Sequence, residues 1–246
     1  GTMTGAQPAR LLPVSTDEVF AYLDREGRVA HYGRVAHRVA LSRSGYINHG
    51  RTPGQLIVQA PDGSFRASIP VAGYPVFAGE RIFVVSAAGG MLSEWTIDGE
   101  RRWQMDLPAP LVALAAGSDR VGLGVLAGDP LLLDGTGALV ELQRAAMARN
   151  PLALDVDLSD QVPRFATVTS TGDDQTMDGT GPALVTLYDL LEDAAVPIVR
   201  RTIERSTAAP PVVRLLDGGE VLLYSAVDRL SETQDAPSRH TAVALE

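Results

Sequence analysis

Two acidic stretches contain the side chains best suited to hold a metal ion. Residues 174–179 read DQTMDG, which has the alternating carboxylates and the glycine that open a calcium-binding loop. The twelfth position of such a loop needs a bidentate Glu and is Val185 here, and the flanking residues read as strands rather than helices. We therefore expect a solvated acidic loop, in which Asp174 and Asp178 are only weak metal candidates.

The other potential metal ligands are no better placed. Asp155, Asp157 and Asp160 follow the edge of a predicted strand, where alternating carboxylates usually face water. The four histidines, at positions 31, 37, 49 and 240, show no HExxH spacing. His31 and His37 fall in or beside predicted strands, so we expect packing or solvent-facing roles for them. No metal site follows from these residues.

The residue types needed for common enzyme chemistry are also missing. All 21 basic residues are Arg, which excludes a lysine Schiff base and a P-loop lysine. Cysteine is absent, and there is no Gly-x-Ser-x-Gly nucleophile motif. The glycines at 122 and 124 lie inside an apolar strand rather than in a phosphate loop. We expect no enzyme and no cofactor, although the 30 acidic residues leave paired-carboxylate glycoside chemistry open.

Composition narrows the class of partner. The formal net charge of −9 argues against nucleic-acid binding, which needs a concentrated positive field. Hydrophobic residues make up 45% of the 246 residues, enough for a large core, and no apolar run approaches the roughly 18 residues of a membrane span. Gly1-Thr2-Met3 resembles a cloning remnant, so we expect residues 4–246 to form one domain.

The elements that position these residues recur along the chain. Short apolar strands flank acidic-Gly turns within 22–32, 59–69, 96–107 and 131–142, and their glycines are Gly27, Gly63, Gly99 and Gly135, each 36 residues after the last. An Asp-Gly pair such as Asp98-Gly99 suits a tight hairpin, because glycine tolerates the positive φ that the turn requires. We expect these glycines to be structural.

A second kind of strand pair lies between these hairpins, at 39–49, 74–87, 111–125 and 211–227. One period therefore contains four strands, A to D, which is the four-stranded antiparallel blade of a β-propeller. We place C–D pairs at 17–34, 55–70, 91–108, 130–143 and 183–203, and a further C strand from 240. The fold prediction is an all-β propeller of about six blades, with five or seven as alternatives.

The chain begins and ends part-way through a blade in this scheme. Closure of the ring by strands from both termini would explain that, and so would excision from a longer protein. Residues 141–150 are the best helix candidate, as one short connection.

One hairpin carries a family signature. Gly99-Glu100-Arg101-Arg102-Trp103, after Leu92 and Ile97-Asp98, resembles the Gly-x-x-x-Trp motif of PQQ-like (WD40-like) β-propeller repeats. The resemblance implies that Trp103 docks against the next blade and clamps the ring. It covers most of 17–143 as a pattern, but the tryptophan is present in one repeat only.

The resemblance also implies a setting and a partner class. Similar propellers include bacterial lipoproteins of outer-membrane assembly, so we expect a bacterial protein of the periplasm or cell envelope, with the cytoplasm as the alternative. The quinone-dependent dehydrogenases of the family are longer and carry adjacent cysteines, which this chain lacks.

Three connections exceed the repeat length, and we expect function there. They are 143–151, between strands D and A, and 170–182 and 228–240, both between strands B and C. In this strand order all three emerge on one face, where Arg164 is also expected. The predicted partner-binding residues are Arg144, Arg149, Asp173, Asp174, Asp178, Arg229, Asp235 and Arg239.

These features predict a non-catalytic scaffold that binds protein partners. The alternative is a ligand-sensing or hydrolytic propeller with a small molecule over its central channel. The apolar A strands argue against a polar catalytic channel.

Overall fold

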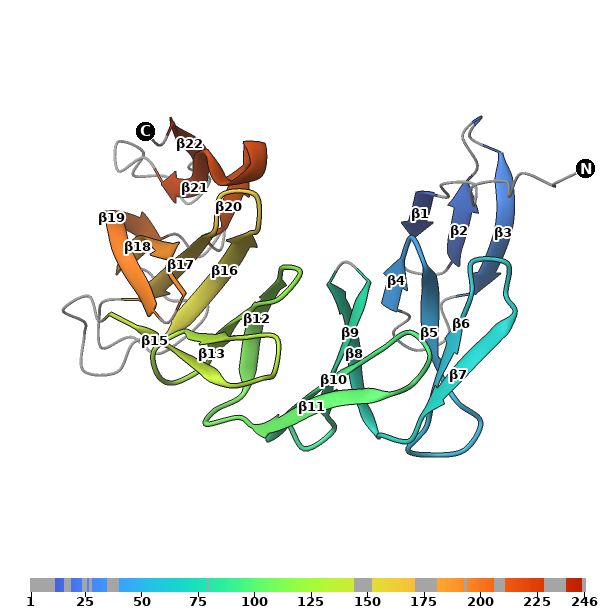
Figure 1. Cartoon of the computed structure of the whole chain (residues 1–246). Coiled ribbons are helices and arrows are strands. Elements are labelled where there is room, and N and C mark those ends of the chain that lie inside the picture. The colour runs from blue at the N-terminus through green and yellow to red at the C-terminus, as the bar shows by residue number, and fades with distance from the viewer. Residues whose placement is uncertain are drawn as a thin grey trace, which may run out of the picture. The chain divides into compact units, whose positions relative to one another are not determined.

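Almost all of the regular secondary structure in the described chain is β-strand, as the sequence predicts. The computed structural model describes residues 12–15, 19–23, 26, 28–34, 40–78, 80–143, 152–170, 181–192, 194–205, 211–227 and 238–244. Within these residues the chain forms 22 strands and one 3₁₀-helix, η1 (Asp217–Gly219) (Figure 1). The chain divides into two compact units, Gly1–Gln104 and Met105–Glu246, with the boundary inside strand β11.

The N-terminal unit contains three antiparallel sheets that follow one another along the chain. The first is β1-β2-β3, the second is β4 to β7 in sequence order, and the third is β8 to β11. The strands are β1 (Leu12–Ser15), β2 (Val19–Leu23), β3 (Val29–Arg34), β4 (Ala40–Ser42), β5 (Gly45–His49), β6 (Leu56–Gln59), β7 (Phe65–Ile69), β8 (Gly73–Ala78), β9 (Arg81–Ser86), β10 (Met91–Trp95) and β11 (Arg101–Asp106).

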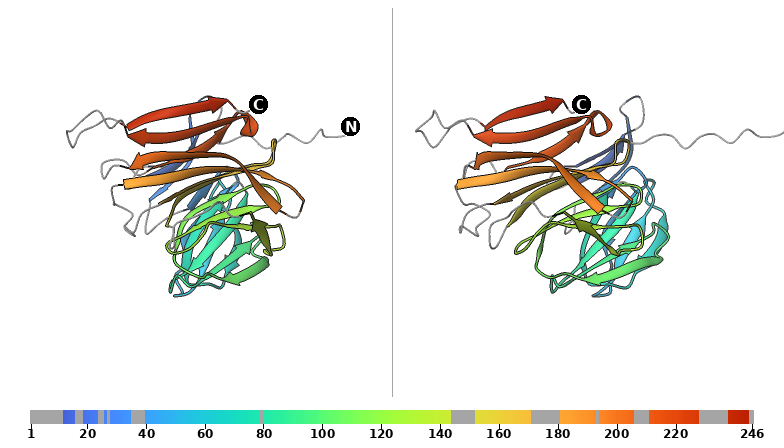
Figure 2. Two further views of the ribbon diagram at one scale, coloured as in Figure 1. Left: turned by 90° about the vertical axis from the view of Figure 1, so that its left-hand side faces the viewer. Right: turned by 60° about the vertical axis from the view of Figure 1, so that its left-hand side comes forward.

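The C-terminal unit contains an eight-stranded and a three-stranded sheet. Two successive meanders, β12 to β15 and β16 to β19, join through a short parallel pairing of β15 with β19, and β20-β21-β22 follow. The strands are β12 (Leu111–Ala116), β13 (Val121–Val125), β14 (Leu131–Leu133), β15 (Leu139–Leu142), β16 (Ala153–Ser159), β17 (Arg164–Ser170), β18 (Gly181–Leu190), β19 (Ala194–Arg205), β20 (Val213–Leu216), β21 (Val221–Val227) and β22 (Ser238–Ala244). The sheet β20–β22 lies over β16–β19 in Figure 2.

The predicted strand pairs are confirmed. The five C–D pairs are the antiparallel hairpins β2–β3, β6–β7, β10–β11, β14–β15 and β18–β19, and the pair predicted at 211–227 is β20–β21. The last predicted C strand is β22, which begins at Ser238. The predicted helix at 141–150 is wrong at its start, because Glu141 and Leu142 belong to β15; residues 144–150 lie outside the described part of the chain.

The turn glycines follow the predicted chemistry in two hairpins and depart from it in a third. Gly63 and Gly99 have φ of +87° and +83°, and each donates its N–H to the carbonyl three residues earlier. In the hairpin β14–β15 the residue at this position is Gly137, with φ of +84°, rather than Gly135. The fourth turn therefore lies two residues later than the strict 36-residue repeat predicts. Gly27 lies outside the described residues.

Neighbouring sheets pack through apolar faces. In the N-terminal unit, Ile82, Val84 and Trp95 of the third sheet join one buried cluster with Leu56 and Ile69 of the second. In the C-terminal unit, β16–β19 is covered on both faces. Its Val168 and Val185 belong to a cluster with β20–β22, and its Phe165 belongs to a cluster with β14.

In the two meanders of the C-terminal unit the second strand is the most completely buried, not the first. Every residue of β13 and β17 is buried, whereas every residue of β12, the predicted apolar A strand, is half-buried. Both β13 and β17 have a strand on either side, and β17 also packs against apolar clusters on both faces.

Candidate functional site

The aspartates along β16 hydrogen-bond the backbone of the neighbouring sheet. Oδ2 of Asp155 accepts from the Val213 amide at 2.9 Å, and Oδ2 of Asp157 accepts from the Leu215 amide at 2.7 Å. Asp155 also forms an ion pair with Arg214 at 2.5 Å. Burial raises the pKa of the Asp157 carboxyl despite these hydrogen bonds. The expectation that these carboxylates face water is wrong, because they substitute for strand pairing between β16 and β20.

Asp160 makes a similar hydrogen bond to the neighbouring meander β12–β15. Its Oδ2 accepts from the Ser118 amide at 2.6 Å, in the turn between β12 and β13. A side chain on the preceding residue, Gly117, would overlap this carboxylate. The glycine therefore lets the turn approach close enough for the bond to form.

Arg164 lies where the same turns meet, and not on the predicted partner face. Its side chain is buried, with Nε donating to Asp189 at 3.0 Å and Nη1 donating to the Gly219 carbonyl at 2.8 Å. The prediction for Arg164 is wrong because this residue follows the β16–β17 turn. It therefore lies at the start of β17, whereas the long connection 171–180 follows the end of that strand. Its hydrogen bond to Gly219 links the β16–β17 turn to η1.

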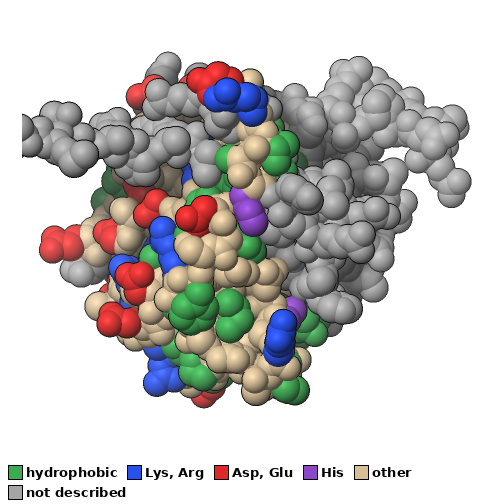
Figure 3. Space-filling model, turned by 90° about the vertical axis from the view of Figure 1, so that its right-hand side faces the viewer, with side chains coloured by type: hydrophobic (Ala, Val, Ile, Leu, Met, Phe, Trp, Pro, Cys, Tyr) green, Lys and Arg blue, Asp and Glu red, His purple; other side chains and the backbone are tan. Residues whose placement is uncertain are grey.

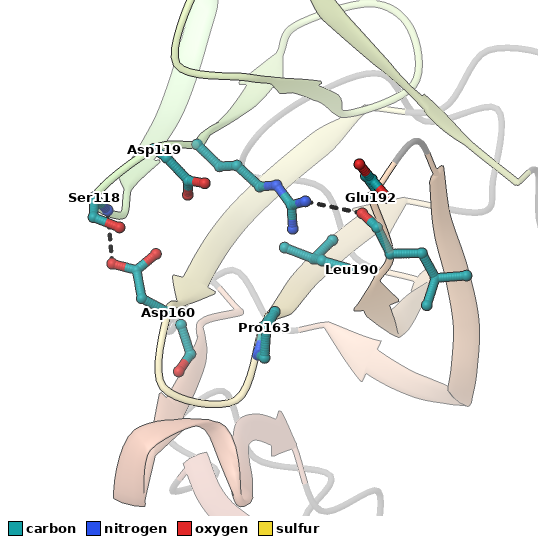
Figure 4. A pocket seen from close by; sticks show the side chains of 9 residues that line it. Ser118, Asp119, Asp160, Pro163, Leu190 and Glu192 are labelled. Carbon is teal, nitrogen blue, oxygen red and sulfur yellow. Dashed lines mark hydrogen bonds between the residues drawn. The ribbon is translucent and has the colours of Figure 1, made fainter.

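A pocket opens among these turns in the C-terminal unit (Figure 4). Its volume is about 260 Å³, and it lies between the turns β12–β13, β16–β17 and β18–β19. Arg120 crosses it and donates to the Leu191 carbonyl at 2.8 Å. Asp119 and Glu192 also line it, and among the described residues neither carboxylate has a hydrogen-bond or ion-pair partner.

Two further hollows continue from this pocket. The second, of about 340 Å³, shares Asp119, Arg120 and Glu192 with the first and reaches Leu139. The third, of about 320 Å³, shares Leu139 and Val140 with the second and is largely apolar. The first two hollows lie among these turns, and the third extends along the hairpin β14–β15. Because neighbouring hollows share lining residues, we call the three together the groove.

Most of the predicted partner-binding residues lie outside the described residues. These are Arg144, Arg149, Asp173, Asp174, Asp178, Arg229 and Asp235. Arg239 is on β22, which the structure describes only as backbone. Within the described part of the chain, no group of three His, Cys, Asp or Glu residues could hold a metal ion.

The strands that flank the two long B–C connections end at one edge of the C-terminal unit. Ser170 ends β17 opposite Ala183 near the start of β18, and the Leu152 amide donates to the Ser170 hydroxyl. Strand β20 runs alongside β16 in the same direction, and Val227 of β21 pairs with Ser238 beyond the start of β20. This end of the unit is opposite the turns that line the first two hollows.

The hairpin β10–β11 contains Asp98, Gly99 and Trp103, which we predicted to have structural roles. A side chain on Gly99 would lie 2.9 Å from Cβ of Ala67, so this turn packs closely on β7. Asp98 is exposed beside it. Trp103 is 8% exposed, and its ring centroid lies 6.1 Å from that of Phe83 in its own sheet. Docking of Trp103 on a further blade stays a prediction.

Figure 3 shows how charged side chains are distributed on one described face. In the view of Figure 3 the basic side chains lie singly among acidic and neutral ones rather than in a patch. In the described part of the chain, no helix is long and apolar enough to cross a membrane.

The meanders, with their short turns and buried second strands, are those of propeller blades. A family described as beta-propeller protein matches residues 3–170, more than half of the sequence. The chain belongs to the β-propeller family. No curated protein matches this propeller significantly.

Solved structures share the propeller fold at low sequence identity. Hsv2 of Kluyveromyces lactis is 11% identical, with a TM-score of 0.61 over 96% of this chain and 83% of its own. The computationally designed Ika8 protein is 14% identical, with a TM-score of 0.60 over 91% of this chain and 67% of its own. BBS1N, solved in complex with ARL6DN, is 16% identical, with a TM-score of 0.54 over 88% of this chain and 71% of its own. At these identities the likeness shows the fold alone.

The groove was missed at the sequence level because its lining comes from three turns far apart in the chain. The one available signal was the pair Gly117 and Asp160, two turn residues whose roles become clear only when the sheets meet.

Proposed function

We propose that this β-propeller is a non-catalytic scaffold of six blades that binds protein partners. The two four-stranded meanders of the eight-stranded sheet count as separate blades, and the first and last blades have three strands each. The PQQ-like signature around Trp103 supports a bacterial protein of the periplasm or cell envelope.

The observation that carries the proposal is the common edge at which the strands flanking two long connections end. Ser170, Gly181, Val227 and Ser238 are the strand ends at that edge. Enlarged connections on neighbouring blades offer a broad surface, which suits a protein partner better than a small molecule. The Arg and Asp residues predicted on these connections would supply its polar contacts.

Two further observations support a binding role without catalysis. Asp155, Asp157, Asp160 and Arg164 are engaged in holding sheets together, so their hydrogen-bonding capacity is committed to structure. BBS1N, a propeller of similar fold, was solved bound to ARL6DN, and we propose the same general use here.

The test replaces the long connections and measures partner capture. Residues 144–151, 171–180 and 228–237 are exchanged for Gly-Ser spacers of equal length, and the protein is used to capture partners from its source cell. We expect capture to be lost while the thermal transition is retained. The matched control exchanges the ordinary B–C connection at 51–54, which should leave capture intact. Unchanged capture by the triple exchange would contradict the proposal.

A further inference from the structure

The groove of the C-terminal unit is lined in part by exposed apolar side chains, and its neighbouring hollows share lining residues. Leu139 is 65% exposed and Leu191 is 54% exposed, although both are large hydrophobic residues. Leu139 lines the second and third hollows, and Leu191 lines the first. Exposed apolar side chains gathered along one groove are characteristic of surfaces that bind other proteins.

The polar lining of the groove has one predominant sign. Asp119, Asp134, Glu141, Asp160 and Glu192 line the three hollows, and Arg120 is their one basic lining residue. The Arg120 guanidinium already donates to the Leu191 carbonyl. Asp160 accepts a hydrogen bond from the β12–β13 turn and Asp134 accepts hydrogen bonds within its own turn, which leaves the carboxylates of Asp119, Glu141 and Glu192 without partners among the described residues.

We propose that this groove binds an extended segment of a partner protein in which Arg or Lys residues alternate with apolar residues. In such a segment successive side chains point to opposite sides, so the apolar ones can lie against Leu139 and Leu191 while the cationic ones meet Asp119 and Glu192. The formal net charge of −9 also favours the approach of a cationic partner.

The turns that line the first two hollows lie at the end of the unit opposite the strand ends that flank the two long B–C connections, and the third hollow extends along the hairpin β14–β15. The inference adds a second partner and its chemistry to the proposed scaffold, and each can fail alone. Exchanging the long connections should leave binding at the groove unchanged, because no residue of the groove belongs to them.

The test uses a fluorescein-labelled 12-residue peptide that alternates Arg with Leu, measured by fluorescence anisotropy against the full chain. One control peptide has Glu in place of Arg, and another has Ser in place of Leu. Wild-type protein should bind the Arg-Leu peptide, bind the Ser peptide at least fivefold more weakly and not bind the Glu peptide. Affinity should fall as salt rises, because exposed charges are screened.

Paired substitutions locate the binding. Asp119→Asn with Glu192→Gln should weaken the Arg-Leu peptide about fivefold, while Asp98→Asn with Glu100→Gln, which removes the same charge elsewhere, should not. Leu139→Ser with Leu191→Ser should weaken it similarly, against Phe65→Ser with Val76→Ser as the apolar control. Thermal unfolding of each variant confirms that it is folded.

Three results would overturn the inference. Equal weakening by the groove and control charge pairs would mean nonspecific attraction to an acidic protein. Equal binding of the Ser peptide would remove the apolar part of the recognition. Binding of the Glu peptide would show that the sign of the charge is wrong.

Discussion

Gly122 is small for a packing reason. It lies in the fully buried strand β13, and a methyl group there would overlap the ring of Phe165 from the neighbouring meander β16–β19. Gly122 therefore leaves room for an aromatic ring. This agrees with the prediction that residues 122–124 lie in a strand and not in a phosphate loop.

Gly122→Ala should destabilise the protein by about 1–3 kcal/mol, because overpacking forces the ring or the backbone to shift. Urea unfolding measures this, and Phe165→Leu in the same chain should recover part of the loss. Gly90→Ala is the matched control. Its methyl would meet nothing within 4 Å, so it should be neutral or stabilising. Equal effects at both sites would contradict the packing argument.

Asp157 makes stability depend on pH in an unusual direction. Burial raises its pKa in the folded state, so between the ordinary carboxyl value and that raised value the folded protein holds more protons than the unfolded chain. Its contribution to stability is therefore present at low pH and lost as pH rises. Asp157→Asn removes this loss. The free energy of unfolding of the variant should therefore rise relative to that of wild type as pH increases from 4 to 7.

Asp134 provides a control of opposite sign. Hydrogen bonds from the Thr136 hydroxyl and nearby amides lower its pKa, so its contribution is present above the ordinary carboxyl value and lost in acid. Asp134→Asn should therefore lose stability relative to wild type as pH rises. Urea titrations from about pH 2 to pH 7 compare the two variants, because the Asp134 contribution changes mainly below the ordinary carboxyl value, and parallel trends would be inconsistent with this account.

At the scale of elements, the hairpin β14–β15 tests which glycine occupies the turn position of the repeat. Gly137 occupies the left-handed position, whereas Gly135 has ordinary backbone angles. Gly137→Ala should cost about 1–2 kcal/mol, because a side chain is strained at that φ. Gly135→Ala should cost less, since its methyl meets only the Asp119 carbonyl at 3.2 Å. A larger loss of stability at Gly135 than at Gly137 would indicate that the turn follows the strict 36-residue repeat after all.

Strand β11 supplies a second element-level prediction. Trp103 is buried against Phe83, on the face of the sheet that also carries Glu94, itself paired with Arg81 at 2.6 Å. Trp103→Ala should cost about 3–5 kcal/mol, the range for a buried large-to-small change. Thermal and urea unfolding measure it, and a negligible loss would refute a structural role for this side chain.

At the scale of the molecule, two edges of the C-terminal unit are proposed to bind different partners. The triple exchange of long connections should abolish capture and spare the Arg-Leu peptide, while the Asp119→Asn and Glu192→Gln pair should do the reverse. Each protein is measured in both assays. Loss of both activities in either variant would mean that the two surfaces are not independent.

Local chemistry made the strands and hairpins predictable from sequence. Asp98-Gly99 turns the chain through its own backbone preferences, so the hairpin can be read without its neighbours. The shift from Gly135 to Gly137 was not readable, because both glycines of Asp-Gly-Thr-Gly permit a tight turn and only the strand pairing chooses between them.

The sequence by itself determined an all-β propeller of repeated meanders, because alternation and turn residues act within a few positions of the chain. Only the tertiary structure decided what the polar residues do. Asp157 meets the Leu215 amide, Arg164 meets Gly219, and Leu139 joins Leu191 in one groove through contacts between residues about 50 or more positions apart. Such contacts depend on how the meanders and sheets pack together, and no local pattern encodes them.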